Sequence, residues 1–319
     1  MAQPTTSTVH VDVALSNISL AYIQSADAFI ANRVFPTVPS ATQTNKYFKY
    51  TKNDWFRDEA ALRAPGTESA GSGYNVTTDS FSCDVYALHK DIDDQTMANA
   101  DAAINLEREA AMFVAQRMLT KREIEWASTF FATSVWATDK TGATDFTQWD
   151  NYGTSKPLVD VQAGKTYILS QTGFEPNTLV IGYNVYASLL NHPEIVDRIK
   201  YTTSDTITQQ IMARYFGVDN LYVARAVKAT NVEGETAAYS FTHGKHALLC
   251  YVAPTPGLLT PSAGYTFSWN GVSDGAGLSI GTSRFYIPET RVWRVESQMA
   301  WDSKVVATDL GYFLSSAVA

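Results

Sequence analysis

Cysteine is scarce in this chain of 319 residues, and its two thiols, Cys83 and Cys250, lie far apart in different apolar, strand-like runs. Two buried free thiols are therefore expected rather than a disulfide, which fits a reducing compartment. No apolar run is long enough to cross a membrane, and no basic residue precedes the first apolar stretch as in a secretory signal. We expect synthesis in the cytoplasm and no membrane partner.

Basic residues are outnumbered, with 24 Lys and Arg against 32 Asp and Glu, a net charge of −8 and a pI of about 5.1. This balance argues against a surface built to neutralise nucleic-acid phosphates. Hydrophobic residues make up 45% and aromatic residues 12% of the chain. Such a composition predicts a folded protein, long enough for one large or two ordinary domains.

Catalytic motifs are also missing: there is no P-loop, no G-x-G-x-x-G and no C-x-x-C. Residues 277–281 match the G-x-S-x-G elbow around Ser279, but that motif needs a preceding strand, a following helix and a later histidine. Here a glycine-rich loop precedes it, a strand is expected after it, and no histidine lies beyond His246. His243 and His246 lack the further ligands of a structural zinc site. We expect no catalytic residue, cofactor or metal, and keep a serine hydrolase acting through Ser279 as a rival hypothesis.

The longest regular stretch spans residues 105–131 and predicts a single helix. Asn105 is a favoured N-cap, acidic residues occupy the first turn, and neither Gly nor Pro interrupts the run. Apolar residues form a broad stripe that includes Phe113, Met118 and Trp126. Because residues 121–123 are charged, we expect the middle of this spine helix to face the surface or a neighbouring molecule.

Before the spine helix, residues 46–88 predict a long hairpin. A strand-like run begins at residue 47 and a returning strand covers residues 81–86, with glycine-rich turn sequences between them. Aromatic and charged residues flank the tip, as is typical of a contact surface rather than a core. Residues 1–45 carry spaced apolar anchors, among them Phe29, Ile30, Val34 and Phe35, and predict an arm that lies on another surface.

After the spine helix, residues 132–157 are expected to form a loop. Helices and strands then alternate up to residue 224, which predicts an inserted α/β unit. Residues 229–245 are expected to be a polar loop, followed by a strand over residues 246–252, and residues 270–283 an exposed connection. Near the end, Trp293, Val295, Met299 and Trp301 alternate with polar residues and predict a half-buried antiparallel strand under the spine helix, with the strand region ending near residues 312–314.

The order and spacing of short sequence strings resemble the major capsid proteins of tailed bacteriophages, with the Hong Kong 97-type fold, over nearly the whole chain. No single string is diagnostic. The strings are Trp55–Ala61, Arg63–Glu68, Asn105–Arg108, Arg122-Glu123, Pro176–Gly182, Asn191–Pro193, Asp197–Tyr201, Phe216–Asp219, Pro256–Leu258, Gly264–Phe267 and Asp302–Ala307.

The resemblance implies an α+β fold in five segments. They are an N-terminal arm (1–45), an E-loop hairpin (46–88), a peripheral domain with the spine helix (89–157), an axial domain (158–282) and a return to the peripheral domain (283–319). In the family the E-loop lies across a neighbouring subunit, which makes Trp55, Phe56, Arg57 and Arg63 the expected intersubunit contacts. The spine-helix residues singled out are Asn105, Phe113, Met118 and Trp126.

The implied function is self-assembly, as hexamers and pentamers, into an icosahedral shell that encloses double-stranded DNA without sequence-specific binding. The shell would be part of the virion and would assemble in the bacterial cytoplasm. Expected partners are other copies of the chain, a portal and a decoration protein. Since no long helical segment like the family's fused scaffolding domain is seen, we expect a separate scaffolding protein or a removed segment. The alternative is an encapsulin-like compartment that encloses cargo enzymes.

Overall fold

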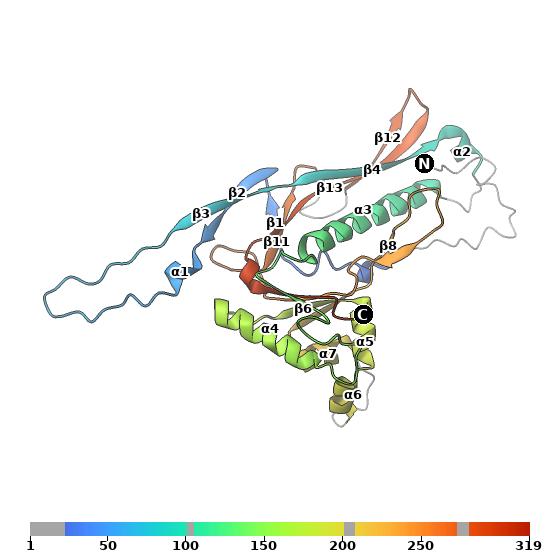
Figure 1. Ribbon diagram of the computed structural model, residues 1–319. Helices are drawn as coiled ribbons and strands as arrows, with labels where there is room; N and C mark the ends of the chain where they lie inside the picture. The colour runs from blue at the N-terminus through green and yellow to red at the C-terminus, as the bar shows by residue number, and fades with distance from the viewer. Residues whose placement is uncertain (1–22, 101–104, 201–207, 273–280) are drawn as a thin grey trace.

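The structure is a computed structural model that describes residues 23–100, 105–200, 208–272 and 281–319. Its central element is helix α3, Leu106–Phe130, 25 residues long. The Asn105 side chain accepts a hydrogen bond from the backbone N–H of Arg108 at 3.0 Å, so the predicted N-cap is confirmed. Figure 1 shows α3 between a long sheet above it and a second, helix-covered sheet below it.

The first sheet is built around β13, Val292–Val305. Its strand order is β1-β11-β13-β12, and β4 pairs antiparallel with β13 along ten residues. The bounds are Thr37–Ser40 (β1), Asp84–Asp93 (β4), Gly264–Trp269 (β11) and Gly281–Ile287 (β12). Val295, Met299 and Trp301 are buried as predicted, while Trp293 is half-buried. Because these side chains share one face, β13 packs against α3 through contacts with Val114 and Met118.

The second sheet has the order β5-β14-β10-β6-β7. Its strands are Thr138–Thr141 (β5), Thr178–Gly182 (β6), Asn220–Ala224 (β7), Ala247–Cys250 (β10) and Gly311–Ser315 (β14). The middle strands β6, β10 and β14 are buried at every position, which explains why their sequences are continuous apolar runs rather than alternating ones. Both cysteines are free and buried, as expected.

Helices Pro157–Thr172 (α4), Tyr183–Leu190 (α5) and Gln209–Phe216 (α7) pack on the second sheet, and Pro193–Lys200 (α6) packs on α5. They match the predicted alternation of helices and strands. Helices α4 and α7 each end at a glycine in the left-handed conformation, Gly173 (φ 74°) and Gly217 (φ 64°). This conformation closes a helix at little cost only in the absence of a side chain.

The structure corrects several expectations about which residues form strands and which sheet each strand joins. Residues 132–157 are not all loop, because they contain β5. The last strand, β14, lies in the second sheet and not in the first, whereas β11 of the expected axial segment belongs to the first sheet. Residues 229–245 are not wholly loop either, since β8 (Val227–Ala229) pairs with β9 (Tyr239–Phe241). Strand partners far apart in sequence decide the positions of β5, β11 and β14, and local patterns do not report them.

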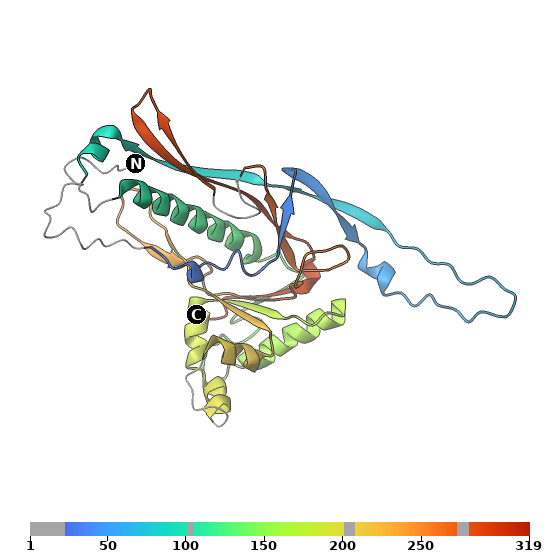
Figure 2. The same ribbon diagram turned by 180° about the vertical axis from the view of Figure 1, so that it is seen from behind.

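The described part of the arm packs on its own subunit. A short 3-10 helix, η1 (Ala26–Ala28), leads into the anchors Phe29, Ile30, Val34 and Phe35, all buried. The Phe35 ring lies against Trp126 and Phe130 of α3, with centroid distances of 5.7 and 4.5 Å. Strand β1 then pairs in parallel with β11, so that the arm contacts first α3 and then the first sheet (Figure 2).

The predicted hairpin is formed by β2 (Thr44–Tyr50) and β3 (Val76–Ser82), paired antiparallel over seven residues. A single helical turn, α1 (Lys52–Trp55), follows β2. Beyond α1 the chain forms a long loop that projects away from the rest of the subunit in both views. The remaining short elements are α2 (Asp94–Ala98) and η2 (Thr308–Leu310).

Candidate assembly surfaces

The hairpin exposes large apolar side chains that its own subunit does not cover. Trp55 is 54% and Phe56 62% exposed, and Leu62 near the tip is fully exposed. Leaving such side chains in water forgoes about 1.5–3 kcal/mol each relative to full burial. Exposed apolar residues that gather on one projecting element are typical of an interaction surface.

The base of this exposed loop is held by an aromatic cluster of Tyr50, Trp55 and Tyr74. Their ring centroids lie 6.2, 6.1 and 5.7 Å apart, so each ring contacts the other two. The Asp54 carboxylate accepts the backbone N–H of Asn75 at 2.8 Å and ties the outgoing chain to the returning one. This cluster sets the direction in which the loop leaves the two-stranded ribbon.

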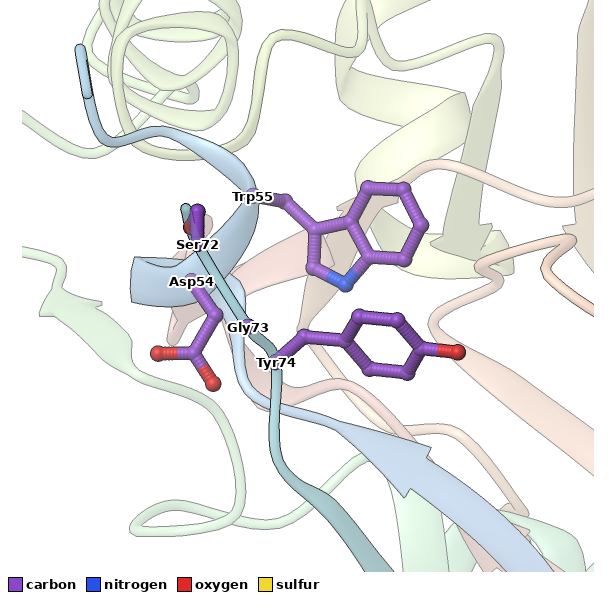
Figure 3. A pocket seen from close by; sticks show the side chains of 5 residues that line it. All are labelled: Asp54, Trp55, Ser72, Gly73 and Tyr74. Atoms are coloured by element: carbon purple, nitrogen blue, oxygen red, sulfur yellow. The ribbon is translucent and has the colours of Figure 1, made fainter. Parts of the chain in front are cut away.

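Beside the cluster lies an open pocket of about 240 Å³, lined by Asp54, Trp55, Ser72, Gly73 and Tyr74 (Figure 3). Sites for small molecules usually measure about 300–1,000 Å³ and enclose most of the ligand. This shallow recess is therefore better suited to a side chain than to a cofactor.

The two predicted arginine contacts differ in their surroundings. Arg57 is 61% exposed and lies 3.6 Å from Glu59, a distance at which an exposed ion pair contributes little. The Arg63 Nε donates to the Thr67 carbonyl at 2.6 Å and shapes the turn at the tip. Thus Trp55, Phe56 and Arg57 lie at the base of the loop, and Arg63 lies further along it.

The hairpin is firmly joined to the subunit at its root. Phe81 stacks on Phe267 of β11 with a centroid distance of 4.1 Å, and the Lys52 ammonium lies 2.5 Å from the Asp309 carboxylate of η2. The backbone N–H of Ser82 donates to Asp302 of β13 at 3.0 Å. A rigid root with an exposed loop is the geometry expected of an element that reaches another molecule.

The spine-helix residues singled out from the sequence fall into two groups. Met118 and Trp126 are buried, and Trp126 belongs to an aromatic group with Phe35, Phe130 and Phe131. Phe113 is 45% exposed and lies under the cations of Lys90 and Arg117, at 5.5 and 4.9 Å from its ring centroid. Asn105 acts as the N-cap. The four residues therefore shape the helix at different points and do not form one site.

The expectation that residues 121–123 face outward is wrong for two of the three. Lys121 is exposed, but Arg122 is 3% exposed and Glu123 is completely buried. The helix is covered by the first sheet in its N-terminal half and by the arm and the second layer in its C-terminal half. The charges alone suggested a solvent-exposed face of the helix, and only the packing of the arm shows that two of them are buried.

The hydrogen bonds of the buried His192 give it a structural place in the fold. Ser279 lies outside the described residues. His192 is buried, its Nδ1 accepts the backbone N–H of Glu194 at 3.2 Å, and its Nε2 lies 2.9 Å from the Ser155 hydroxyl, which donates to the Asn151 carbonyl. This serine is held as a donor within a turn, away from the surface, which gives it a structural role.

Within the described ranges, no three His, Cys, Asp or Glu side chains lie close enough together to hold a metal ion. No helix in that part of the chain is long and apolar enough to span a membrane.

Comparison with known proteins gives consistent results at the level of sequence and fold. No protein-family model matches the chain. The major capsid protein of Burkholderia phage BcepMu is 25% identical over 268 residues, which cover 82% of this chain and 84% of that protein.

Among solved structures, a phage-related protein from Bordetella bronchiseptica RB50 has a TM-score of 0.67 at 23% identity, covering 96% of this chain and 97% of that one. The capsid of cyanophage P-SCSP1u has a TM-score of 0.59 at 10% identity and covers 93% and 90%. An encapsulin from Synechococcus elongatus has a TM-score of 0.57 at 10% identity and covers 96% and 95%. These likenesses extend over nearly the whole chain, and phage capsids and an encapsulin share the fold.

Proposed function

We propose that the chain is a major capsid protein of the tailed-bacteriophage type and that it assembles as hexamers and pentamers into an icosahedral shell around double-stranded phage DNA; its likeness to a phage major capsid protein and its Hong Kong 97-type fold support this. The observation that supports this step most directly is the projecting hairpin with exposed Trp55, Phe56 and Leu62. Each hairpin would lie across the next subunit, so that shell stability sums over many modest, mostly heterologous contacts.

We propose that the two sheets belong to domains with different roles in the shell. The second sheet with α4–α7 would form the axial domain that lines the centre of a capsomer. The first sheet, α3 and the hairpin would form the peripheral domain and the contacts between subunits. A net charge of −8 suits a shell that contains DNA without gripping its phosphates.

Further partners and the place of assembly belong to the same proposal. We propose a portal, a separate scaffolding protein and a decoration protein as partners, and assembly in the bacterial cytoplasm before the shell becomes part of the virion. Co-expression with each partner gene, followed by electron microscopy, distinguishes closed shells from open or aberrant ones.

The central experiment removes the loop of the hairpin, residues 61–74, and images the purified protein by negative stain. We expect folded subunits that form no shells, because the loop is exposed and its removal spares both sheets. Circular dichroism and thermal unfolding check the fold. Normal shells from this variant would contradict the role given to the hairpin.

Point variants sharpen this test. Trp55→Ala and Arg57→Ala should impair shell formation while leaving subunit stability within about 0.5 kcal/mol of wild type. Tyr239→Ala is the matched control, since Tyr239 is 71% exposed but lies on β9 outside the hairpin. It should change neither assembly nor stability.

The encapsulin-like alternative shares the fold and differs in its contents. Mass spectrometry of shells purified from the native source distinguishes them: DNA with portal protein supports the phage shell, whereas an enclosed enzyme supports the alternative. A hydrolase acting through Ser279 predicts labelling by a fluorophosphonate, and an unlabelled serine removes that hypothesis.

A further inference from the structure

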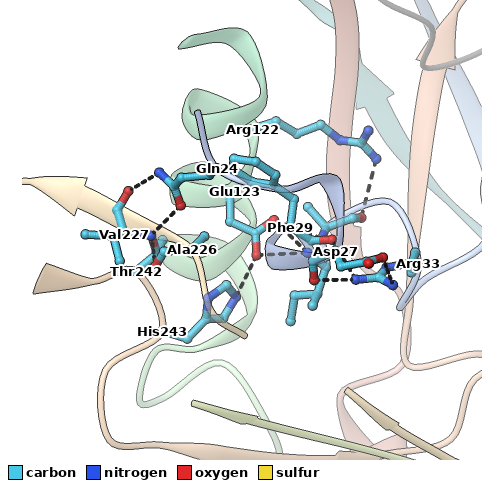
Figure 4. A network of polar contacts seen from close by, with 12 residues as sticks. Gln24, Asp27, Phe29, Arg33, Arg122, Glu123, Ala226, Val227, Thr242 and His243 are labelled. Carbon is cyan, nitrogen blue, oxygen red and sulfur yellow. Dashed lines mark hydrogen bonds and ion pairs between the residues drawn. The ribbon is translucent and has the colours of Figure 1, made fainter. Parts of the chain in front are cut away.

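The buried carboxyl group of Glu123 contacts the arm at one point. Its Oε2 accepts hydrogen bonds from the backbone N–H groups of Ile30 and Ala31 at 3.1 and 2.9 Å, and its Oε1 also accepts the Ile30 N–H, at 3.1 Å (Figure 4). One oxygen could therefore hold both amides by itself. The Glu123 side chain is wholly inaccessible to solvent, so its ionisation state is set by its neighbours.

His243 lies on the other side of this carboxyl group. Its Nε2 is 3.6 Å from Glu123 Oε1, and neither ring nitrogen has a hydrogen-bond partner among the described residues. The ring is buried against Trp126 and Phe131, with centroid distances of 5.4 and 5.0 Å. An unpartnered buried nitrogen is costly, and it faces an oxygen that could carry a proton toward it.

The charged groups around the pair are mostly cationic, and the exposed Asp27 carboxylate lies 3.5 Å from Arg33. Arg122 is on the same helix and donates to the Ala31 carbonyl at 3.3 Å. Arg33 of the arm is tied to the carbonyls of Asp27 and Phe29. Lys228 of β8 and His246 act on His243 through their charge, and both disfavour a second positive charge there.

We propose that Glu123 and His243 hold a single proton between them, carried by the Glu123 carboxyl where it faces the neutral imidazole, and that this pair anchors the root of the arm to its own subunit. Oε2 accepts the two amides of the arm, and Oε1, which also accepts the Ile30 amide, carries the proton on the side that faces Nε2 at 3.6 Å. The proton on His243 in water passes to Glu123 when the pair is buried, so no proton is gained or lost at mildly acidic pH. The inference concerns the isolated subunit and does not depend on shell assembly.

Neighbouring contacts extend the same anchor. Gln24 exchanges two hydrogen bonds with the backbone of Val227, at 2.8 and 2.9 Å, and the Arg225 N–H donates to the Ala28 carbonyl at 3.4 Å. The arm is thereby held to α3 by Glu123 and to the chain around β8 by Gln24. The anchored root spans residues 24–31.

The pH dependence follows from the direction of each shift. Burial raises the pKa of Glu123 to about 7 and lowers the pKa of His243 to about 3, from ordinary values of 4.5 and 6.5. The docked pair thus holds one proton between about pH 3 and 7, whereas the solvated pair holds two below 4.5, one from 4.5 to 6.5 and none above. The free energy that holds the arm on the subunit should therefore be constant from pH 4.5 to 6.5. It should weaken below pH 4.5, and weaken slightly as the pH rises from 6.5 to 7.

Two substitutions distinguish a pair that holds one proton on Glu123 from a buried ion pair of a carboxylate and an imidazolium. Glu123→Gln imitates the protonated carboxyl, since its carbonyl can accept the amides and its NH2 can donate to His243. His243→Phe keeps an aromatic ring against Trp126 and Phe131 but removes the accepting nitrogen. Glu109→Gln, on the exposed face of the same helix, is the matched control.

The measurement is hydrogen–deuterium exchange of residues 26–35 in full-length, unassembled subunits at pH 6, normalised to an unstructured peptide. We expect Glu123→Gln and Glu109→Gln to retain wild-type protection and His243→Phe to lose at least tenfold. Equal loss in Glu123→Gln would show that the carboxylate is ionised and would overturn the proposal, as would full protection in His243→Phe. Should a variant fail to fold, ¹⁵N-histidine NMR of the wild type at pH 5.5 decides, because a cationic His243 would also overturn it.

Discussion

Replacing Trp301 by alanine should remove a large part of the contact between β13 and α3. Trp301 is 1% exposed, stacks on Tyr86 at a centroid distance of 4.3 Å, and packs with Met118 and Met299. Truncation of a fully buried tryptophan costs about 3–5 kcal/mol, because transfer free energy is lost and a cavity remains. We expect the upper half of this range, since the aromatic stack is lost with it.

The assay is urea unfolding of unassembled subunits followed by circular dichroism, so that association does not add to the apparent stability. Trp301→Phe should cost clearly less than Trp301→Ala. Phenylalanine fills part of the space, and the indole N–H that it removes has no hydrogen-bond partner among the described residues. Trp55→Ala is the control for tryptophan at an exposed position and should change the free energy of unfolding by less than about 0.5 kcal/mol.

An unchanged unfolding midpoint in Trp301→Ala would refute the packing of β13 under the spine helix. A loss equal to that of Trp55→Ala would do the same. Equal losses in Trp301→Ala and Trp301→Phe would instead contradict the argument that cavity volume dominates.

The other predictions concern single interactions. Asn105→Ala removes the N-cap of α3 and should destabilise the subunit by about 1 kcal/mol in urea unfolding; no change would mean that the cap is replaced by water. Gly182→Ala should cost at least about 1–3 kcal/mol, because the new Cβ would lie 2.2 Å from the Gly244 carbonyl oxygen, and a wild-type melting temperature would contradict this close approach. Arg294 binds both oxygens of Asp91, at 2.7 and 2.8 Å, and lowers the pKa of that carboxyl. The stabilisation is present above the ordinary pKa of 3.8 and is lost as the pH falls, so the difference in melting temperature between wild type and Arg294→Met should shrink at low pH, and a constant difference would count against it.

Local patterns predicted those elements whose contacts are mostly local. The N-cap, length and uninterrupted composition of residues 105–131 predicted α3 to within a residue at each end. The alternation around Trp301 predicted a half-buried strand, and the turn residues between two strand-like runs predicted the hairpin. These features follow from backbone propensity and periodicity, which the sequence displays directly.

Apart from the local pairing of β8 with β9, the errors involve partners distant in the chain. Strand β14 joins β10 rather than the first sheet, and the short β5 adds to β14 in parallel. Nothing in residues 138–141 or 311–315 specifies these neighbours. The roles given to Trp55, Phe56, Arg57 and Arg63 remain predictions, because a subunit displays which side chains are exposed and not what covers them.

By itself, then, the sequence determined the spine helix, the hairpin, the central strand and, through the order of its short strings, the resemblance to a capsid protein. Only the tertiary structure decided where the charged middle of the spine helix lies. Arg122 and Glu123 belong to a polar run, which on an isolated helix would face water. They are enclosed because residues 24–35 fold back over them, and a carboxyl group that accepts two backbone amides beside a buried imidazole can satisfy its polar atoms without solvent.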